Sequence, residues 1–294
     1  MSKPRVRSSS QPQDSRSQPL TPPSEVGPAL PPSLSAEATR RLSEQLKELR
    51  LPTFREHYQA LADQAVRESL SHSHYLAELV SRECQTRNHS RIARLMRNSR
   101  LLLGKTWDQF QWSRVPLQVA RQTQSLRDAT FLDRRENVLV FGKPGSGKTH
   151  LLSALGEQLV QQGRTVLFTS CSFLVQELLV AKRELKLSRL IKKLAGFEAL
   201  IIDDLGYVQQ SREEMEVLFT LLAERYERGS VLLTSNLPFS KWEQIFKDPM
   251  TTAAAIDRLV HHSVILELNN ESYRAQKALE RQGKPTGPGK ENPS

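Results

Sequence analysis

VLVFGKPGSGKTHLL, residues 138–152, is the stretch that decides the fold. It opens with four apolar residues, passes through a glycine-rich turn and enters a second apolar pattern at Leu151. The turn has the spacing G-x-x-x-x-G-K-T, from Gly142 to Thr149. A buried strand, such a turn and the start of a helix together form a phosphate-binding loop. A tight turn with a chance lysine is the weaker interpretation, because the strand and helix patterns are both in register.

The residue types of this loop suit the phosphates of a nucleotide. Glycines allow successive backbone N–H groups to point at an anion, and the following helix adds the positive end of its dipole. Lys148 is expected to reach the β- and γ-phosphates, and the Thr149 hydroxyl to ligate Mg²⁺. The predicted nucleotide contacts are Gly142, Lys143, Pro144, Gly145, Ser146, Gly147, Lys148, Thr149 and His150.

Strands and helices alternate after the loop. Apolar runs predict strands over 165–169, 200–203, 231–234 and 264–268, and helical spacing predicts helices over 150–162, 172–194 and 212–228. Such alternation implies a parallel sheet covered on both faces. We predict an α/β fold, a P-loop core with a parallel five-stranded sheet.

Acidic residues end the strand LIIDD, residues 200–204. A carboxylate at the carboxyl edge of the sheet lies beside the phosphate loop, so Asp203 is expected to hold Mg²⁺, directly or through water. Asp204 is expected to orient the attacking water. Strands often end in aspartate, and the pattern gains weight here from its place downstream of a P-loop.

Two further residues are candidates for catalysis. The Asn236 amide follows the strand over 231–234 and is expected to hydrogen-bond the γ-phosphate or the water; the alternative is a turn residue before Pro238. Thr234 is a weaker candidate for the same role. Arg258 precedes the last strand, at a rim from which it would reach a neighbouring subunit's γ-phosphate. Its alternative is an ion pair with Asp257. We also expect residues around 131–132 to flank the adenine ring.

The formal net charge is +10, which predicts a polyanionic partner, nucleic acid first. Arginines spaced by three lie near one face of a helix and suit phosphate contacts along a duplex. The competing interpretation of each basic run is a solvated helix face. The candidates for DNA contact are Arg91, Arg94, Arg97 and Arg100 in one run and Lys182, Arg183, Lys186 and Arg189 in a second.

Composition divides the rest of the chain. Residues 1–34 are rich in Ser, Pro, Gln and Arg and are predicted to be a disordered leader. We expect a small helical bundle that contacts DNA or a partner over residues 35–105, followed by a connector over 106–133. The P-loop domain is expected over 134–275 and a flexible tail over 276–294. The two cysteines have no metal spacing, and no apolar run is long enough to span a bilayer, which together predict a cytoplasmic protein without a membrane partner.

Several stretches resemble the IstB-like AAA+ proteins, which are related to the DnaC helicase loader. They are GKPGSGKTHL, LIIDDLGY, ERYERGSVLLTSNLPFSKWEQIF, AAAIDRLVHHSVIL, NNESYR and, nearer the start, LKELRLPTFREHY. The resemblance covers about residues 42–274 and implies an ATPase that uses ATP and Mg²⁺. It also implies assembly as a homo-oligomer on target duplex DNA, delivery of that DNA to a cognate transposase, and resetting by hydrolysis.

The resemblance assigns the phosphate loop to 142–149 and the acidic strand end to Asp203 and Asp204. It makes Asn236 the sensor and Arg258 the arginine finger, with Arg274 a weaker sensor-like candidate. Many family members carry Glu where this chain has Asp204, which implies slow hydrolysis. Two alternatives stay open: a loader of replicative helicase that binds single strands, and an architectural DNA-binding module whose nucleotide site is only structural.

Overall fold

The computed structural model describes residues 34–206, 211–246 and 248–268, and this part of the chain divides into two compact units. The first ends at Glu83 and the second begins at Cys84. The predicted leader and tail lie outside the described residues, apart from Leu34, and so does Arg274. No helix in the described ranges combines the length and the apolar character that a bilayer crossing requires.

Helices make up the first unit. They are α1 (Ala36–Glu48), α2 (Pro52–Arg67) and the first part of α3 (His72–Ser99). The Ser35 hydroxyl accepts from Ala38 N and begins α1, whereas α2 has no side-chain cap of its own. The buried Glu83 carboxylate supplies that missing acceptor, taking the Thr53 backbone N–H at 2.9 Å.

The second unit contains the predicted α/β core, and its sheet confirms the fold class. The strands are β1 (Asn137–Gly142), β2 (Val166–Ser170), β3 (Ala199–Leu205), β4 (Ser230–Ser235) and β5 (Ser263–Leu268). All neighbours are parallel and the order is β2-β3-β4-β1-β5. The strand before the phosphate loop therefore lies inside the sheet, buried on both faces.

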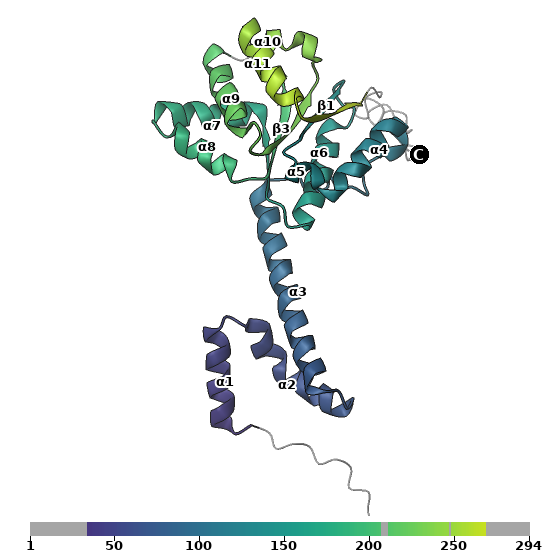
Figure 1. The fold of residues 1–294 in the computed structure, drawn as a ribbon, viewed down its shortest axis with the longest axis vertical. Coiled ribbons are helices and arrows are strands. Elements are labelled where there is room, and N and C mark those ends of the chain that lie inside the picture. Colours follow the sequence, from purple (N-terminus) through teal and green to yellow (C-terminus); the bar gives the residue numbers. More distant parts are fainter. Residues whose placement is uncertain (1–33, 207–210, 247, 269–294) are drawn as a thin grey trace, which may run out of the picture. The chain divides into compact units, whose positions relative to one another are not determined.

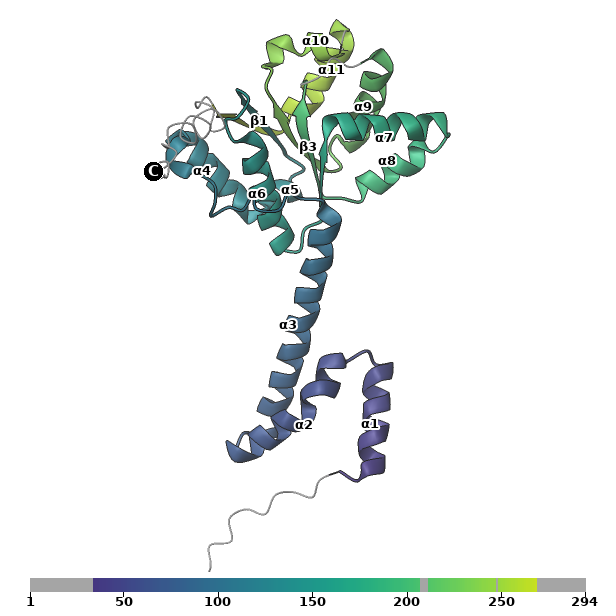
Figure 2. The same ribbon diagram turned by 180° about the vertical axis from the view of Figure 1, so that it is seen from behind.

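Helices cover both faces of this sheet (Figures 1 and 2). One face packs against α7 (Cys171–Arg183), α8 (Leu187–Ala195), α9 (Arg212–Arg225), α10 (Glu243–Phe246) and α11 (Pro249–Val260). The other packs against α4 (Leu117–Ser125), α5 (Thr130–Asp133) and α6 (Lys148–Gln161). Alternate residues of β1 enter the two cores, Leu139 the first and Val138 and Val140 the second.

Two short 3₁₀ turns, η1 (Trp112–Arg114) and η2 (Leu126–Asp128), flank α4, and a third, η3 (Phe239–Lys241), follows β4. The segment predicted as a connector, 106–133, contains α4 and α5 as well, and its apolar side chains fill the core beneath α6. The division into compact units falls inside α3 rather than at residue 105, because the last turns of α3 also pack on that core.

The predicted helix over 172–194 is two helices. Leu185 has a φ of 57° and ends α7, and the backbone turns before α8 begins at Leu187. A helical spacing of leucines continues through this turn, so apolar periodicity alone does not reveal the break.

Candidate nucleotide-binding site

The glycine-rich loop runs from β1 into the N-terminus of α6, as its sequence predicts. Its residues 144–150 line a cavity of about 720 Å³, and Asp204 and Asn236 line the same cavity. Gly147 directly precedes α6 with a φ of 101°, a left-handed value that favours glycine. The first backbone N–H groups of a helix have no partner within the helix, and at the start of α6 they border the cavity and make it suited to an anion.

Gly142 does not line the cavity, but no larger residue fits its place. A Cβ there would lie 2.3 Å from the Leu268 carbonyl oxygen of the neighbouring strand. The Gly142 and Lys143 carbonyls accept from the Lys148 ammonium at 2.8 and 3.1 Å. Lys148 is therefore held inside the loop, with only 5% of the residue exposed.

A β-bulge separates the two aspartates at the end of β3. Ile202 pairs with Leu233 and Leu205 with Ser235, so that Asp203 and Asp204 lie opposite the single residue Thr234. The extra residue turns consecutive side chains to different surroundings. Asp203 is buried, whereas Asp204, with a φ of 62°, is exposed and faces the cavity.

The single hydroxyl of Thr234 fixes this arrangement, because it both donates and accepts a hydrogen bond. The hydroxyl donates to Asp203 Oδ1 at 2.7 Å and accepts from the Asp204 backbone N–H at 2.8 Å. It acts here as a positioning residue for the two aspartates. The sequence alone suggests Thr234 only as a weaker alternative to Asn236.

Burial raises the pKa of Asp203 above its ordinary value, and the negative charge of Asp204 adds to this effect. Hydrogen bonds from Thr234 and Thr149 and the positive charge of Lys105 oppose it. Thr149 is therefore near enough to the Asp203 carboxylate to lower its pKa, which brings together the two residues predicted to hold Mg²⁺.

The residues around the cavity fit a nucleotide with its metal ion. Ser146 Oγ and Asn236 Oδ1 are buried without a hydrogen-bond partner among the described residues, and both residues line the cavity. A buried polar atom without a partner is costly unless a bound group satisfies it. The carboxylate and hydroxyl oxygens of Asp203 and Thr149 are donors that Mg²⁺ prefers.

Arg258 lies away from this cavity, on α11. Its guanidinium stands over the Phe219 ring of α9, 4.8 Å from the centroid, and donates to the Ala254 carbonyl at 3.1 Å. The described residues show no ion pair between Arg258 and Asp257, which was the alternative. Arg258 is half-buried on its own subunit and takes no part in its own subunit's cavity.

Sequence reasoning missed the segment 104–115, which forms another wall of the cavity. Phe110 packs edge-on against His150, with 5.2 Å between ring centroids, and His150 Nε2 lies 3.0 Å from the Thr106 carbonyl oxygen. Lys105 and Arg114 bring positive charge to the same wall. The aromatic cluster at 107–112 is the sequence feature that could have indicated this cavity wall, but such clusters more often pack between domains.

Phe131 and Leu132, near which the adenine ring was expected, lie in the core rather than on the cavity wall. Both are 1% exposed and belong to the core under α6, outside the cavity lining. Their position just before β1 places them beneath the sheet end, and Phe110 and Val115 supply the apolar part of the cavity wall instead.

The two basic runs differ in how far they are neutralised. Arg94, Arg97 and Arg100 are exposed, while Arg91 donates to the Gly163 carbonyl at 3.1 Å and fastens α3 to the end of α6. In the second run Arg183 and Arg189 are exposed, but Lys182 and Lys186 form ion pairs with Glu216 and Glu184, at 3.1 and 2.8 Å respectively.

Relatives of this chain are named for ATP binding. A putative insertion sequence ATP-binding protein of Sinorhizobium fredii is 43% identical over 241 residues, which are 82% of this chain and 81% of that protein. The insertion sequence IS21 putative ATP-binding protein of Pseudomonas aeruginosa is 36% identical over 229 residues, 78% of this chain and 86% of that protein. The crystal structure of the DnaC helicase loader is 16% identical, with a TM-score of 0.49 over 56% of this chain and 97% of that one.

The family model described as IstB-like ATP binding protein matches residues 44–281. This match takes in the phosphate loop, the bulged aspartates and Asn236, as well as α2 and α3. The chain belongs to the IstB-like family of ATP-binding proteins.

Proposed function

We propose that the protein is an ATPase that assembles with ATP on target duplex DNA and delivers that DNA to a cognate transposase. One observation carries the proposal: Lys148, Thr149, Asp204 and Asn236 line a single cavity, and the buried Asp203 precedes Asp204 at the end of the same strand. Relatives named insertion sequence ATP-binding proteins support the transposition context.

In this proposal the loop residues 142–150 bind the triphosphate, with Lys148 leaving the Gly142 and Lys143 carbonyls to meet the β- and γ-phosphates. Thr149 and Asp203 hold Mg²⁺, which neutralises phosphate charge when bound. Asp204 accepts a hydrogen bond from the attacking water, and Asn236 contacts the water or the γ-phosphate. The short Asp204 side chain makes turnover slow without a partner.

Arg258 completes the neighbouring subunit's site. Because its guanidinium does not reach its own cavity, any role at a γ-phosphate requires a second copy of the chain. A heterologous interface of this kind links subunits head to tail. ATP at the interface then favours assembly, and hydrolysis resets the assembly.

DNA contact is proposed for the exposed arginines of α3 and for the basic surface of α7 and α8. These contacts reach phosphates and therefore tolerate many target sequences. The rival function, loading a replicative helicase, requires single strands instead, so strand preference separates the two functions.

The test is ATP-dependent assembly on a duplex of about fifty base pairs, roughly five helical turns. Wild type is compared with Lys148→Ala, Arg258→Ala and the control Arg121→Ala, an exposed arginine of α4. Gel filtration with light scattering should give a large complex only with ATP, duplex, Lys148 and Arg258. A monomer that binds DNA equally well without ATP contradicts the proposal, and a preference for single strands supports the helicase loader.

A further inference from the structure

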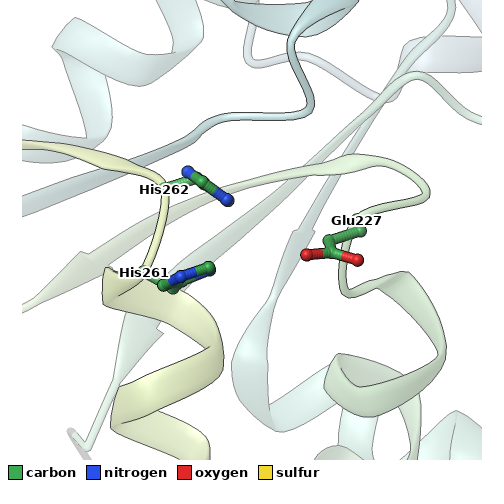
Figure 3. Close-up of side chains that lie close together, drawn as sticks. All are labelled: Glu227, His261 and His262. Atoms are coloured by element: carbon green, nitrogen blue, oxygen red, sulfur yellow. The ribbon is translucent and has the colours of Figure 1, made fainter.

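Three potential metal ligands lie close together (Figure 3). They lie next to the first residues of β4 and β5, at the amino end of the sheet, whereas the phosphate loop follows the carboxyl end of β1. Glu227 follows α9, and His261 and His262 join α11 to β5. One ligand atom from each lies within 4.8 Å of the others, and all three residues are exposed. We infer that Glu227, His261 and His262 form a Zn²⁺-binding site.

A buried amide sets the spacing of the two loops that carry these ligands. Asn137 Nδ2 donates to the Leu259 carbonyl at 3.0 Å, near the end of α11, and Asn137 Oδ1 accepts from Val231 N at 2.8 Å, at the start of β4. The Asn137 backbone N–H donates to the His262 carbonyl at 2.7 Å. The backbones of the two loops are therefore held in place before any ion binds.

The turn that carries Glu227 is anchored from below by Arg225, which is 1% exposed. Its guanidinium donates to the carbonyls of Leu194, Phe197, Glu198 and Ser230. These hydrogen bonds hold the turn against the sheet. The same turn places Glu227 at a φ of 57°.

Tyr226 orients one of the imidazoles. Its hydroxyl lies 3.0 Å from His261 Nδ1. When Nδ1 carries the proton and donates to this oxygen, the lone pair of Nε2 is free for a metal ion, which is the arrangement found around most metal-bound histidines. Tyr226 is thus a positioning residue for the site.

Two imidazoles and one carboxylate form a donor set that suits Zn²⁺, with water as the fourth ligand. Zinc bonds of about 2.0–2.2 Å bring ligand atoms closer together than they now lie. Rotation of exposed side chains is sufficient for this approach. Glu136 lies close to His262, but the Arg134 guanidinium already holds both Glu136 carboxylate oxygens, at 2.7 and 2.9 Å.

A bound ion would fasten the end of α11 to the turn after α9. α11 carries Arg258, whose ring contact is with Phe219 of α9, so the ion would brace the pair of helices that presents this arginine. The site needs no nucleotide, since β1 separates Asn137 from the phosphate loop by its full length.

The test uses the full chain without an affinity tag and measures binding of Co²⁺, by its visible absorption, and of Zn²⁺, by calorimetry. We expect one ion per chain, displacement of Co²⁺ by Zn²⁺, and a higher melting temperature with Zn²⁺. Glu227→Gln and His261→Ala/His262→Ala should each weaken binding at least tenfold. Tyr226→Phe should weaken it about tenfold, as removal of an orienting partner does.

The matched control is His72→Ala/His74→Ala, which removes two exposed histidines at the start of α3. It should bind Zn²⁺ as the wild type does. The inference is overturned if the wild type binds no Co²⁺ or Zn²⁺, or if the control loses binding while the Glu227 and His261 variants keep it. Circular dichroism and nucleotide binding identify a variant that fails to fold. If the histidine variant does so, the Zn²⁺ affinity of Glu227→Gln, which preserves the side-chain shape, tests the inference.

Discussion

Thr234 is the residue on which the geometry of both aspartates depends. Thr234→Val keeps the shape but removes the hydroxyl, which leaves Asp203 Oδ1 and the Asp204 N–H without their partner. Loss of a buried partner costs about 1–3 kcal/mol of unfolding free energy. We expect urea unfolding to show this loss and ATP turnover to fall at least tenfold.

Thr220→Val is the control for this substitution, because the Thr220 hydroxyl lies exposed on α9 and donates to the Glu216 carbonyl of the same helix. It should leave both stability and turnover close to those of the wild type. Equal stability of the two variants would contradict the role assigned to Thr234.

Asp203 makes stability depend on pH in an unusual direction for a carboxylate. Because its folded pKa is raised, the folded state binds the proton more tightly than the unfolded state does. This contribution to stability is present at low pH and is lost as pH rises through the folded pKa. At neutral pH the ionised carboxylate therefore destabilises the nucleotide-free protein.

Asp203→Asn removes this ionisation and keeps an oxygen to accept from Thr234. We expect the variant to resist urea better than the wild type at pH 7.5, without nucleotide or Mg²⁺, and to lose ATP turnover. The advantage should shrink as pH falls towards the ordinary aspartate range. A variant that is less stable than the wild type at pH 7.5 would show that burial does not dominate at Asp203.

At the scale of single residues, the sequence predicted the site residues that belong to a recognisable motif. Lys148, Thr149, Asp204 and Asn236 lie around one cavity because the loop and the strand ends of a parallel sheet meet at one edge. The sequence did not predict Lys105 at the site. The segment 104–115 is distant in sequence from the phosphate loop, and hydrophobic periodicity does not predict that the two meet at the cavity.

Among the helices, α3 carries the exposed arginines that the proposal assigns to DNA. Removing one arginine that neutralises a phosphate should flatten the slope of log affinity against log salt by about 0.9. Arg94→Ala/Arg97→Ala should therefore reduce the slope by up to about 2, with equal effect on unrelated duplex sequences. Fluorescence anisotropy at several salt concentrations measures this slope.

Arg121→Ala, on α4, should leave the slope unchanged. Arg91 is not suited to this comparison, because its guanidinium also holds the Gly163 carbonyl and its removal would loosen α3 from α6. An unchanged slope in the α3 variant would move the proposed DNA contact to α7 and α8.

Element types followed from the sequence more readily than their breaks. Apolar runs of four or five residues identified all five strands, since buried parallel strands carry apolar side chains on both faces. The bulge after Ile202 and the turn at Leu185 have no sequence signal, because each depends on one backbone angle that neighbouring elements impose. The segment 106–133 reads as a connector because its helices are short.

The whole molecule offers a direct test of whether Arg258 acts on a neighbour. Lys148→Ala lacks a working nucleotide site but keeps Arg258, and Arg258→Ala has the reverse defect. Each alone should turn over ATP at least a thousandfold more slowly than the wild type, the effect typical of a missing arginine finger. In an equal mixture, random assortment restores about one quarter of head-to-tail interfaces, and turnover should recover to a similar fraction.

The control mixture combines Lys148→Ala with the double variant Lys148→Ala/Arg258→Ala, which contains no intact nucleotide site. It should stay inactive. No recovery in the first mixture, despite assembly shown by light scattering, would mean that Arg258 serves its own subunit or only holds α11 to α9.

Trp107 and Trp112, in the segment that walls the cavity, give the protein an intrinsic fluorescent probe near its phosphate loop. The Trp107 and Trp112 rings lie 4.5 Å apart in the segment that walls the cavity, whereas Trp242, the third tryptophan, is fully buried in the other core. In a Trp242→Phe variant all emission would come from the pair, so a change of intrinsic fluorescence would time the arrival of nucleotide in a stopped-flow instrument. Subunit docking and ATP capture could then be followed separately without attaching a dye.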